Sequence, residues 1–119
     1  MDWVKYNNIP TEFATAKEIG LAAATLGAMA RKGFVETLDT VPKQYRRIDS
    51  PAVRTYKFLD EHKKEYNTYF VLWKKGKKLG MLCQMSGDKI VDCWGNNYDA
   101  TDVVSICLGN KMYSLEEEQ

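Results

Sequence analysis

The chain has 119 residues, of which 45% are hydrophobic and 28% are charged, and its formal net charge is +1. These values are typical of a folded globular domain and exclude a wholly disordered chain. No apolar run approaches the roughly 18 residues that a membrane-spanning helix needs, and residues 1–5 lack the pattern of a signal peptide, so we expect a cytoplasmic protein with no membrane partner.

A pair of short helices joined by a tight turn is predicted early in the chain. Thr15 is followed three residues later by Glu18, which is the capping-box arrangement that begins a helix, and Gly20 ends that helix. The second helix runs from about 22 to 31 and is rich in alanine, the residue with the highest helix propensity. Gly33 supplies its C-terminal stop.

A β-hairpin is predicted after the helix pair. Residues 34–38 and 44–48 alternate between apolar and polar side chains, as strands do. The loop between them contains Pro42, which has no N–H group to donate to a strand ladder. The first half of the chain therefore has the order helix, turn, helix, hairpin.

The second half is predicted to contain a helix followed by a small antiparallel sheet. Ser50 and Pro51 form a strong helix start, and the helix extends to about Lys64. The alternation pattern favours strands at 69–73, 79–83, 89–94 and 112–115. Residues 99–109 fit either a short helix or a strand, and the sequence leaves both open.

The sequence AKEIG at the first helix, and TLGAMARKGFVE from the second helix into the first strand, resemble winged helix-turn-helix DNA-binding proteins. The resemblance covers about residues 10–49, and the pattern also resembles short regulators carried by phages and other mobile elements. It implies an α+β protein with an N-terminal winged helix-turn-helix in residues 1–49. A helix and a small antiparallel β-sheet in residues 50–119 would then serve dimerisation or partner binding.

The resemblance implies a small DNA-binding regulator that acts by binding double-stranded DNA rather than by catalysis. In this family the second helix enters the major groove and the wing reaches the DNA backbone or the minor groove. The residues implied as contacts are Lys17, Thr25, Arg31, Lys32, Lys43, Gln44, Arg46 and Arg47. On the second helix Thr25 and the alanines can touch thymine methyl groups, but no Arg, Asn or Gln stands at its N-terminal end to offer bidentate base readout.

The densest charge cluster of the chain is a run of four lysines on the predicted hairpin turn of the second half, Lys74, Lys75, Lys77 and Lys78. These lysines add phosphate contacts, or they protect the hairpin from edge-to-edge aggregation. Tyr69 and Trp73 share one face of the neighbouring strand, where they form either part of the core or a stacking platform beside the lysines.

Metal, cofactor and catalytic sites have no support in the residue pattern. Cys83, Cys93 and Cys107 are an odd number with wide spacing, and the single histidine, His62, is far from them in sequence. We therefore expect three buried thiols that act as small hydrophobic residues.

Two alternatives to DNA binding stay open: a protein-interaction module, such as a phage inhibitor of a host nucleic-acid machine, and a small thiol enzyme. A homodimer is a further expectation.

Overall fold

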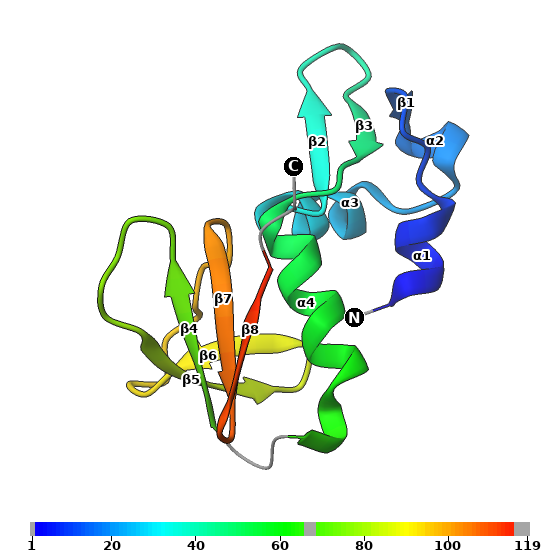
Figure 1. The fold of residues 1–119 in the computed structure, drawn as a ribbon. Coiled ribbons are helices and arrows are strands. Elements are labelled where there is room, and N and C mark those ends of the chain that lie inside the picture. Colours follow the sequence, from blue (N-terminus) through cyan, green and yellow to red (C-terminus); the bar gives the residue numbers. More distant parts are fainter. Residues whose placement is uncertain (1, 66–68, 116–119) are drawn as a thin grey trace.

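The computed structural model describes residues 2–65 and 69–115, which form helices and two antiparallel sheets of three and five strands (Figure 1). The N-terminal elements are α1 Trp3–Asn8, β1 Ala14–Thr15, α2 Ala16–Ile19, α3 Ala23–Arg31, β2 Val35–Leu38 and β3 Gln44–Arg47. The C-terminal elements are α4 Pro51–Glu61, the 3₁₀ turn η1 Lys63–Glu65, β4 Phe70–Lys74, β5 Met81–Ser86, β6 Lys89–Asp92, β7 Val103–Leu108 and β8 Lys111–Ser114.

The predicted limits of the helix pair are confirmed. Thr15 is the N-cap of α2, where its hydroxyl accepts from the Glu18 N–H and the Glu18 carboxylate accepts from the Thr15 N–H at 3.1 Å. Gly20 and Gly33 both have φ +86°, a left-handed conformation that glycine adopts without a Cβ clash. The capping box and the two left-handed glycines therefore determine where α2 begins and where α2 and α3 end.

The predicted hairpin is also present, as the pair β2 and β3. Tyr45 lies opposite Thr37 and is buried, whereas Arg46 lies opposite Glu36 on the other face. β1 adds a third strand on the free side of β3, which gives the sheet order β1-β3-β2. Neither β1 nor α1 was predicted from the sequence.

The helix α4 begins where the sequence predicted and ends three residues earlier. The Ser50 hydroxyl accepts from the Val53 N–H at 3.3 Å and donates to the Gly33 carbonyl at 2.6 Å, which ties the start of α4 to the end of α3. At the other end His62 has φ −111° and ψ 20°, outside the helical range, so the following residues form η1 instead of a further α-turn.

The five-stranded sheet has the order β6-β5-β4-β7-β8, and all of its neighbouring strands are antiparallel. Residues 103–108 are a strand, which answers the question that the sequence left open. Phe70 and Leu72 of β4 are buried, whereas Tyr69 is half exposed, so the predicted alternation of that strand is confirmed.

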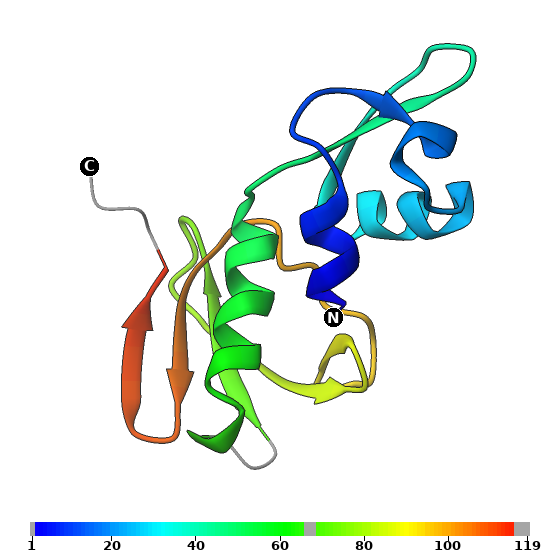
Figure 2. The same cartoon turned by 90° about the vertical axis from the view of Figure 1, so that its right-hand side faces the viewer.

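A single hydrophobic core extends through both halves of the molecule. Helix α4 lies between the three-stranded and five-stranded sheets (Figure 2), and its buried residues Val53 and Leu59 belong to the same cluster as Phe34 and Ile106. None of the helices in the described part of the chain combines the length and the apolar composition that a membrane crossing requires.

Candidate nucleic-acid interface

The outward face of α3 is flat because it is made of small residues. Leu26 and Met29 are buried on the inner side of the helix, while Ala23 and Ala24 are exposed, and Ala24 also borders the groove that contains Asp88. A Cβ atom added at Gly27 would make an ordinary van der Waals contact with Arg31 Nη1, at 3.8 Å, so Gly27 is covered only by this flexible side chain. A second macromolecule can therefore approach the backbone of α3 closely.

Two exposed cations flank this face. Lys17 projects from α2 and Arg31 from the last turn of α3. Within residues 2–65 and 69–115, neither side chain takes part in an ion pair. Both charges are thus available to an anionic partner.

The wing carries a loosely held lysine near its tip. Lys43 Nζ lies 3.5 Å from Asp39 Oδ1, with half of the lysine side chain and 88% of the aspartate side chain exposed. Val41, at the tip itself, is fully exposed, and Gln44 is partly buried at the start of β3. An exposed ion pair of this kind contributes at most about 1 kcal/mol, so Lys43 can exchange Asp39 for a phosphate at little cost.

The two wing arginines are more firmly engaged. Arg46 binds Glu36 Oε2 through Nε at 2.8 Å and Nη2 at 2.6 Å, and its guanidinium lies 4.6 Å from the centre of the Phe13 ring. Arg47 donates from Nη1 to the Asn7 carbonyl at 3.2 Å. These arginines hold the wing against the N-terminal segment, and any DNA contact would have to compete with that role.

Thr25 and Lys32 lie on the side of α3 that faces the second half of the molecule. Thr25 lines a groove of about 420 Å³ that also includes Asp88, at the β5–β6 turn, and Lys32. Lys32 Nζ lies 5.9 Å from the centre of the Tyr56 ring. Thr25 therefore borders a groove within the molecule, and its predicted role in base contacts stays a prediction.

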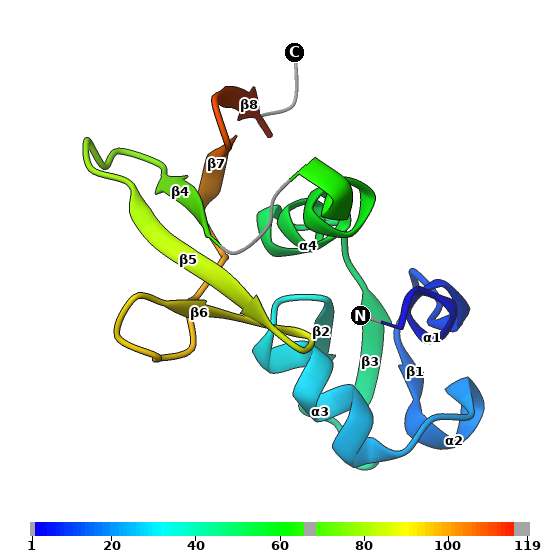
Figure 3. The ribbon, with the colours of Figure 1, turned by 90° about the horizontal axis from the view of Figure 1, so that it is seen from below.

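The lysine run is remote from α2 and the wing. Lys74 is the last residue of β4, where its Nζ lies 4.0 Å from Asp99 Oδ2 and 5.2 Å from the centre of the Tyr98 ring. Lys75, Lys77 and Lys78 are exposed on the β4–β5 loop. Figure 3 shows this loop at the opposite end of the molecule from α2, so one surface does not combine the lysine run with α3 and the wing.

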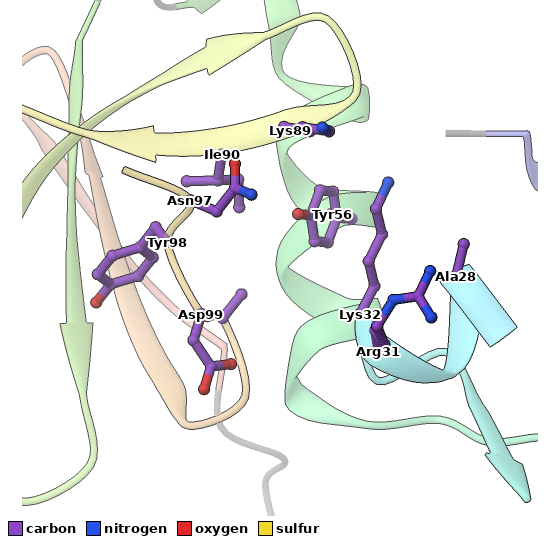
Figure 4. A pocket seen from close by; sticks show the side chains of 10 residues that line it. Ala28, Arg31, Lys32, Tyr56, Lys89, Ile90, Asn97, Tyr98 and Asp99 are labelled. Carbon is purple, nitrogen blue, oxygen red and sulfur yellow. The ribbon is translucent and has the colours of Figure 1, made fainter. Parts of the chain in front are cut away.

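A second cationic surface was not predicted from the sequence. A cleft of about 510 Å³ lies between α3, α4 and β6, and its polar lining comprises Arg31, Lys32, Tyr56, Lys89, Asn97, Tyr98 and Asp99 (Figure 4). Arg31 and Lys32 were singled out for DNA binding, but the other five come from distant segments with no common motif. Only the folding of the sheet against α3 and α4 brings them together.

The stacking platform predicted at Tyr69 and Trp73 is partly covered by the β4–β5 loop. A Cβ atom added at Gly80 would lie 2.7 Å from Trp73 Cε2, which means that the Gly80 backbone already packs on the Trp73 ring. Tyr69 is half exposed. Base stacking on Trp73 would require this loop to move.

The cysteines differ in their exposure. Cys83 is buried, and burial together with the nearby Asp92 and Cys93 raises the pKa of its thiol to about 12. Cys107 is partly buried. Cys93 is exposed, so the expectation of three buried thiols is wrong for Cys93, which lies in the turn after β6 instead of inside the sheet.

The single histidine belongs to an aromatic cluster. The His62 ring stacks on Phe58 with centroids 4.0 Å apart and lies 5.3 Å from the Tyr113 ring, while Nδ1 is 2.8 Å from the Phe58 carbonyl. Nowhere in the described part of the chain do three or more His, Cys, Asp or Glu side chains gather closely enough to hold a metal ion.

Comparison with models of known families, with curated proteins and with solved structures found no match for this chain.

Proposed function

We propose that the protein binds double-stranded DNA through α3 and the β2–β3 wing, as a small regulator that acts by binding. The observation that carries this proposal is the run of small side chains at the surface of α3 together with the exposed cations Lys17 on α2 and Arg31 on α3. Small side chains let a helix approach the floor of a major groove, and flanking cations contact the phosphates on either side.

The order of the N-terminal elements supports the same proposal. Two short helices, α2 and α3, are followed by the hairpin β2–β3, and β1 completes a small sheet with the order β1-β3-β2. This is the arrangement expected of a winged helix-turn-helix, with α3 as the recognition helix and the loop around Val41 as the wing tip. In this docking mode Lys43 contacts the DNA backbone beside the groove.

The side chains of α3 favour phosphate and shape contacts over base-specific readout. Ala23 and Ala24 can touch thymine methyl groups only, because methyl side chains have no hydrogen-bonding atoms. Affinity would then come mainly from counterion release, which is steeply salt-dependent. We therefore propose a protein with modest sequence preference that blocks a stretch of duplex.

The test measures duplex binding by fluorescence anisotropy over a series of salt concentrations. For the wild type we expect affinity that falls steeply as salt rises. The double variant Lys17→Ala, Lys43→Ala should lower the slope of log affinity against log salt by about 2, since each lost phosphate contact removes about 0.9. The matched control Lys64→Ala, Lys111→Ala removes the same charge from exposed positions on η1 and β8 and should leave the slope unchanged.

An equal effect of the two double variants would mean that only the overall charge matters and that α3 and the wing do not form the interface. No binding at low salt would exclude DNA as the partner.

A second candidate function, protein binding, rests on the outer face of the five-stranded sheet. Figure 3 shows α4 on one side of this sheet, and none of the described helices covers the other. Across that outer face a row of apolar residues runs through four strands, because Val71 lies opposite both Leu82 and Cys107, and Cys107 lies opposite Met112. Leu82 and Met112 are 43% and 60% exposed.

The Gly80 backbone packs on Val71 within this row, so Leu82, Cys107 and Met112 provide the apolar surface that suits a partner chain or a second copy of this one. Light scattering after size-exclusion chromatography should show self-association that is lost in the variant Leu82→Glu, Met112→Glu if the partner is a second copy. A monomer in both cases would rule out the homodimer. Binding to a different protein would then be tested by a pull-down with purified nucleic-acid enzymes. The same variant should abolish that binding.

A further inference from the structure

We propose that the cleft between α3, α4 and β6 binds a small organic anion that carries a phosphate or carboxylate group and a flat ring, as a nucleoside monophosphate does. The cleft has a volume of about 510 Å³, which lies within the range of small-molecule sites. This inference concerns a ligand of the protein alone and does not depend on DNA binding.

The charge in the cleft favours an anion. Arg31 and Lys32 project from the end of α3 and Lys89 from β6, and within the described residues none of the three forms a close ion pair. Lys32 interacts electrostatically with Asp88 at the β5–β6 turn, so its charge is partly balanced, whereas Arg31 and Lys89 have no such partner among these residues. The one carboxylate in the lining, Asp99, lies 4.0 Å from Lys74 and is thereby balanced from outside the cleft. Cations that share a partly enclosed cleft repel one another, and the bound anion relieves that repulsion.

The uncharged part of the lining suits a flat ring. Figure 4 shows the Tyr56 ring between the α3 cations and the segment that carries Asn97 and Tyr98, with the Tyr56 hydroxyl directed toward that segment. Ala28, Ile90 and Ala100 add apolar surface. A ring placed here would contact two aromatic side chains while its anionic group stays near Lys32.

Both tyrosines remain protonated at neutral pH, and the Tyr56 hydroxyl is the donor available inside the cleft, because the Tyr98 hydroxyl points away from Tyr56 (Figure 4). Burial raises the pKa of Tyr56, against the effect of a hydrogen bond with the Ile90 backbone. Burial also raises the pKa of Tyr98 to about 12, and Cys83 and Asp99 act in the same direction. Neutral O–H donors beside cations are the groups that orient an anion without opposing its charge.

The walls of the cleft are held in place before any ligand arrives. The Tyr98 N–H donates to the Ile90 carbonyl at 2.8 Å, and the Asp92 N–H donates to the Asn96 carbonyl at 2.9 Å, which fastens the 97–98 segment to β6. Tyr56 is fixed by Phe34 in the core. A site of this kind binds with little loss of conformational entropy.

The test uses isothermal titration calorimetry with AMP as the probe, and adenosine and inorganic phosphate as probes of its two parts. We expect AMP to bind at one site and more tightly than either part. The variant Lys32→Ala, Lys89→Ala should weaken AMP binding at least about tenfold, the effect of losing a charged hydrogen bond. The control Lys75→Ala, Lys111→Ala removes the same charge elsewhere and should bind AMP normally. Circular dichroism checks that each variant folds.

Several outcomes would overturn the proposal. Absence of AMP binding, or AMP binding that both double variants retain, would show that the cleft is not the site. Phosphate that binds as tightly as AMP would exclude recognition of the ring, and adenosine that does so would exclude recognition of the anion. Binding of a short single-stranded oligonucleotide, lost in Lys32→Ala, Lys89→Ala, without AMP binding would assign the cleft to nucleic acid instead.

Discussion

The Phe34 ring packs edge-on against the Tyr56 ring, with centroids 5.1 Å apart and planes at 79°. Phe34 ends the turn after α3 and is fully buried, whereas Tyr56 is in the middle of α4 and faces the cleft. Because α4 also packs on the five-stranded sheet, this pair joins the two halves of the molecule through one core. The two parts that the sequence analysis separated at residue 49 therefore share one hydrophobic core.

The first prediction is that the chain unfolds in one cooperative transition and that Phe34→Ala destabilises both halves together. Removing a fully buried phenylalanine costs about 3–5 kcal/mol. Denaturant unfolding followed by far-ultraviolet circular dichroism and by tryptophan fluorescence should give coincident curves in both proteins. Tyr69→Ala, which alters a half-exposed ring, is the control and should change stability far less. Separate transitions would show that the halves fold independently.

Local signals explain why part of the fold could be predicted. The Thr15 capping box, Gly20, Gly33 and the Ser50–Pro51 start all act through contacts between residues close in sequence. Such contacts form wherever the residues occur in the right spacing. The limits of α2 and α3 and the start of α4 therefore follow from the sequence alone, whereas α1 and the end of α4 do not.

Contacts between distant residues explain what could not be predicted. The segment 103–108 is a strand because it pairs with β4 on one side and β8 on the other, and its composition alone fits both a helix and a strand. The engagement of Arg46 by Glu36 and of Arg47 by Asn7 likewise depends on the strand register and on α1. The cleft is the extreme case, since its cations on α3 and β6 are more than 50 residues apart.

The second prediction contrasts two glycines. Gly27→Ala should stabilise the protein by about 0.5–1 kcal/mol, because Gly27 is in a helix, its added methyl group makes only an ordinary contact with Arg31, and alanine has the higher helix propensity. Gly80→Ala should destabilise it by about 1–3 kcal/mol, because the added methyl group would overlap Val71 and Trp73. Urea denaturation measures both. A stabilised Gly80→Ala would show that the β4–β5 loop does not pack on Trp73.

The third prediction concerns Glu36, which lies opposite Arg46 on the wing. Glu36→Gln removes a negative charge from the proposed DNA-binding face and releases Arg46 from its ion pair. We expect duplex affinity to increase, with a salt slope steeper by about 1, while stability falls by no more than about 1 kcal/mol, as for exposed ion pairs. Glu61→Gln makes the same change on α4 and should leave DNA binding as it is. Unchanged or weaker binding by Glu36→Gln would place the wing outside the interface.

The fourth prediction is a loss of stability at alkaline pH that begins with Cys83. A thiol in the unfolded chain ionises near pH 9, whereas burial holds the pKa of Cys83 at about 12 in the folded protein. The unfolded state therefore releases its proton first, so stability is complete below pH 9 and falls between pH 9 and 12, by at most about 1.4 kcal/mol per pH unit. Tyr98, whose pKa is raised from 10 to about 12, adds to the loss only above pH 10.

Urea denaturation of the wild type and of Cys83→Ala between pH 8 and pH 11 separates the effects of Cys83 and Tyr98. The free energy of unfolding of the variant should no longer fall between pH 9 and 10 but should still fall above pH 10.

Iodoacetamide provides an independent measurement in the native protein. Exposed Cys93 should react readily, and Cys83 should react only after unfolding, because its thiol is buried and protonated. Cys93→Ser identifies which thiol is modified. Rapid labelling of Cys83 in the native protein would show that the five-stranded sheet opens. It would also support the alternative of a thiol enzyme with Cys83 as the reactive residue.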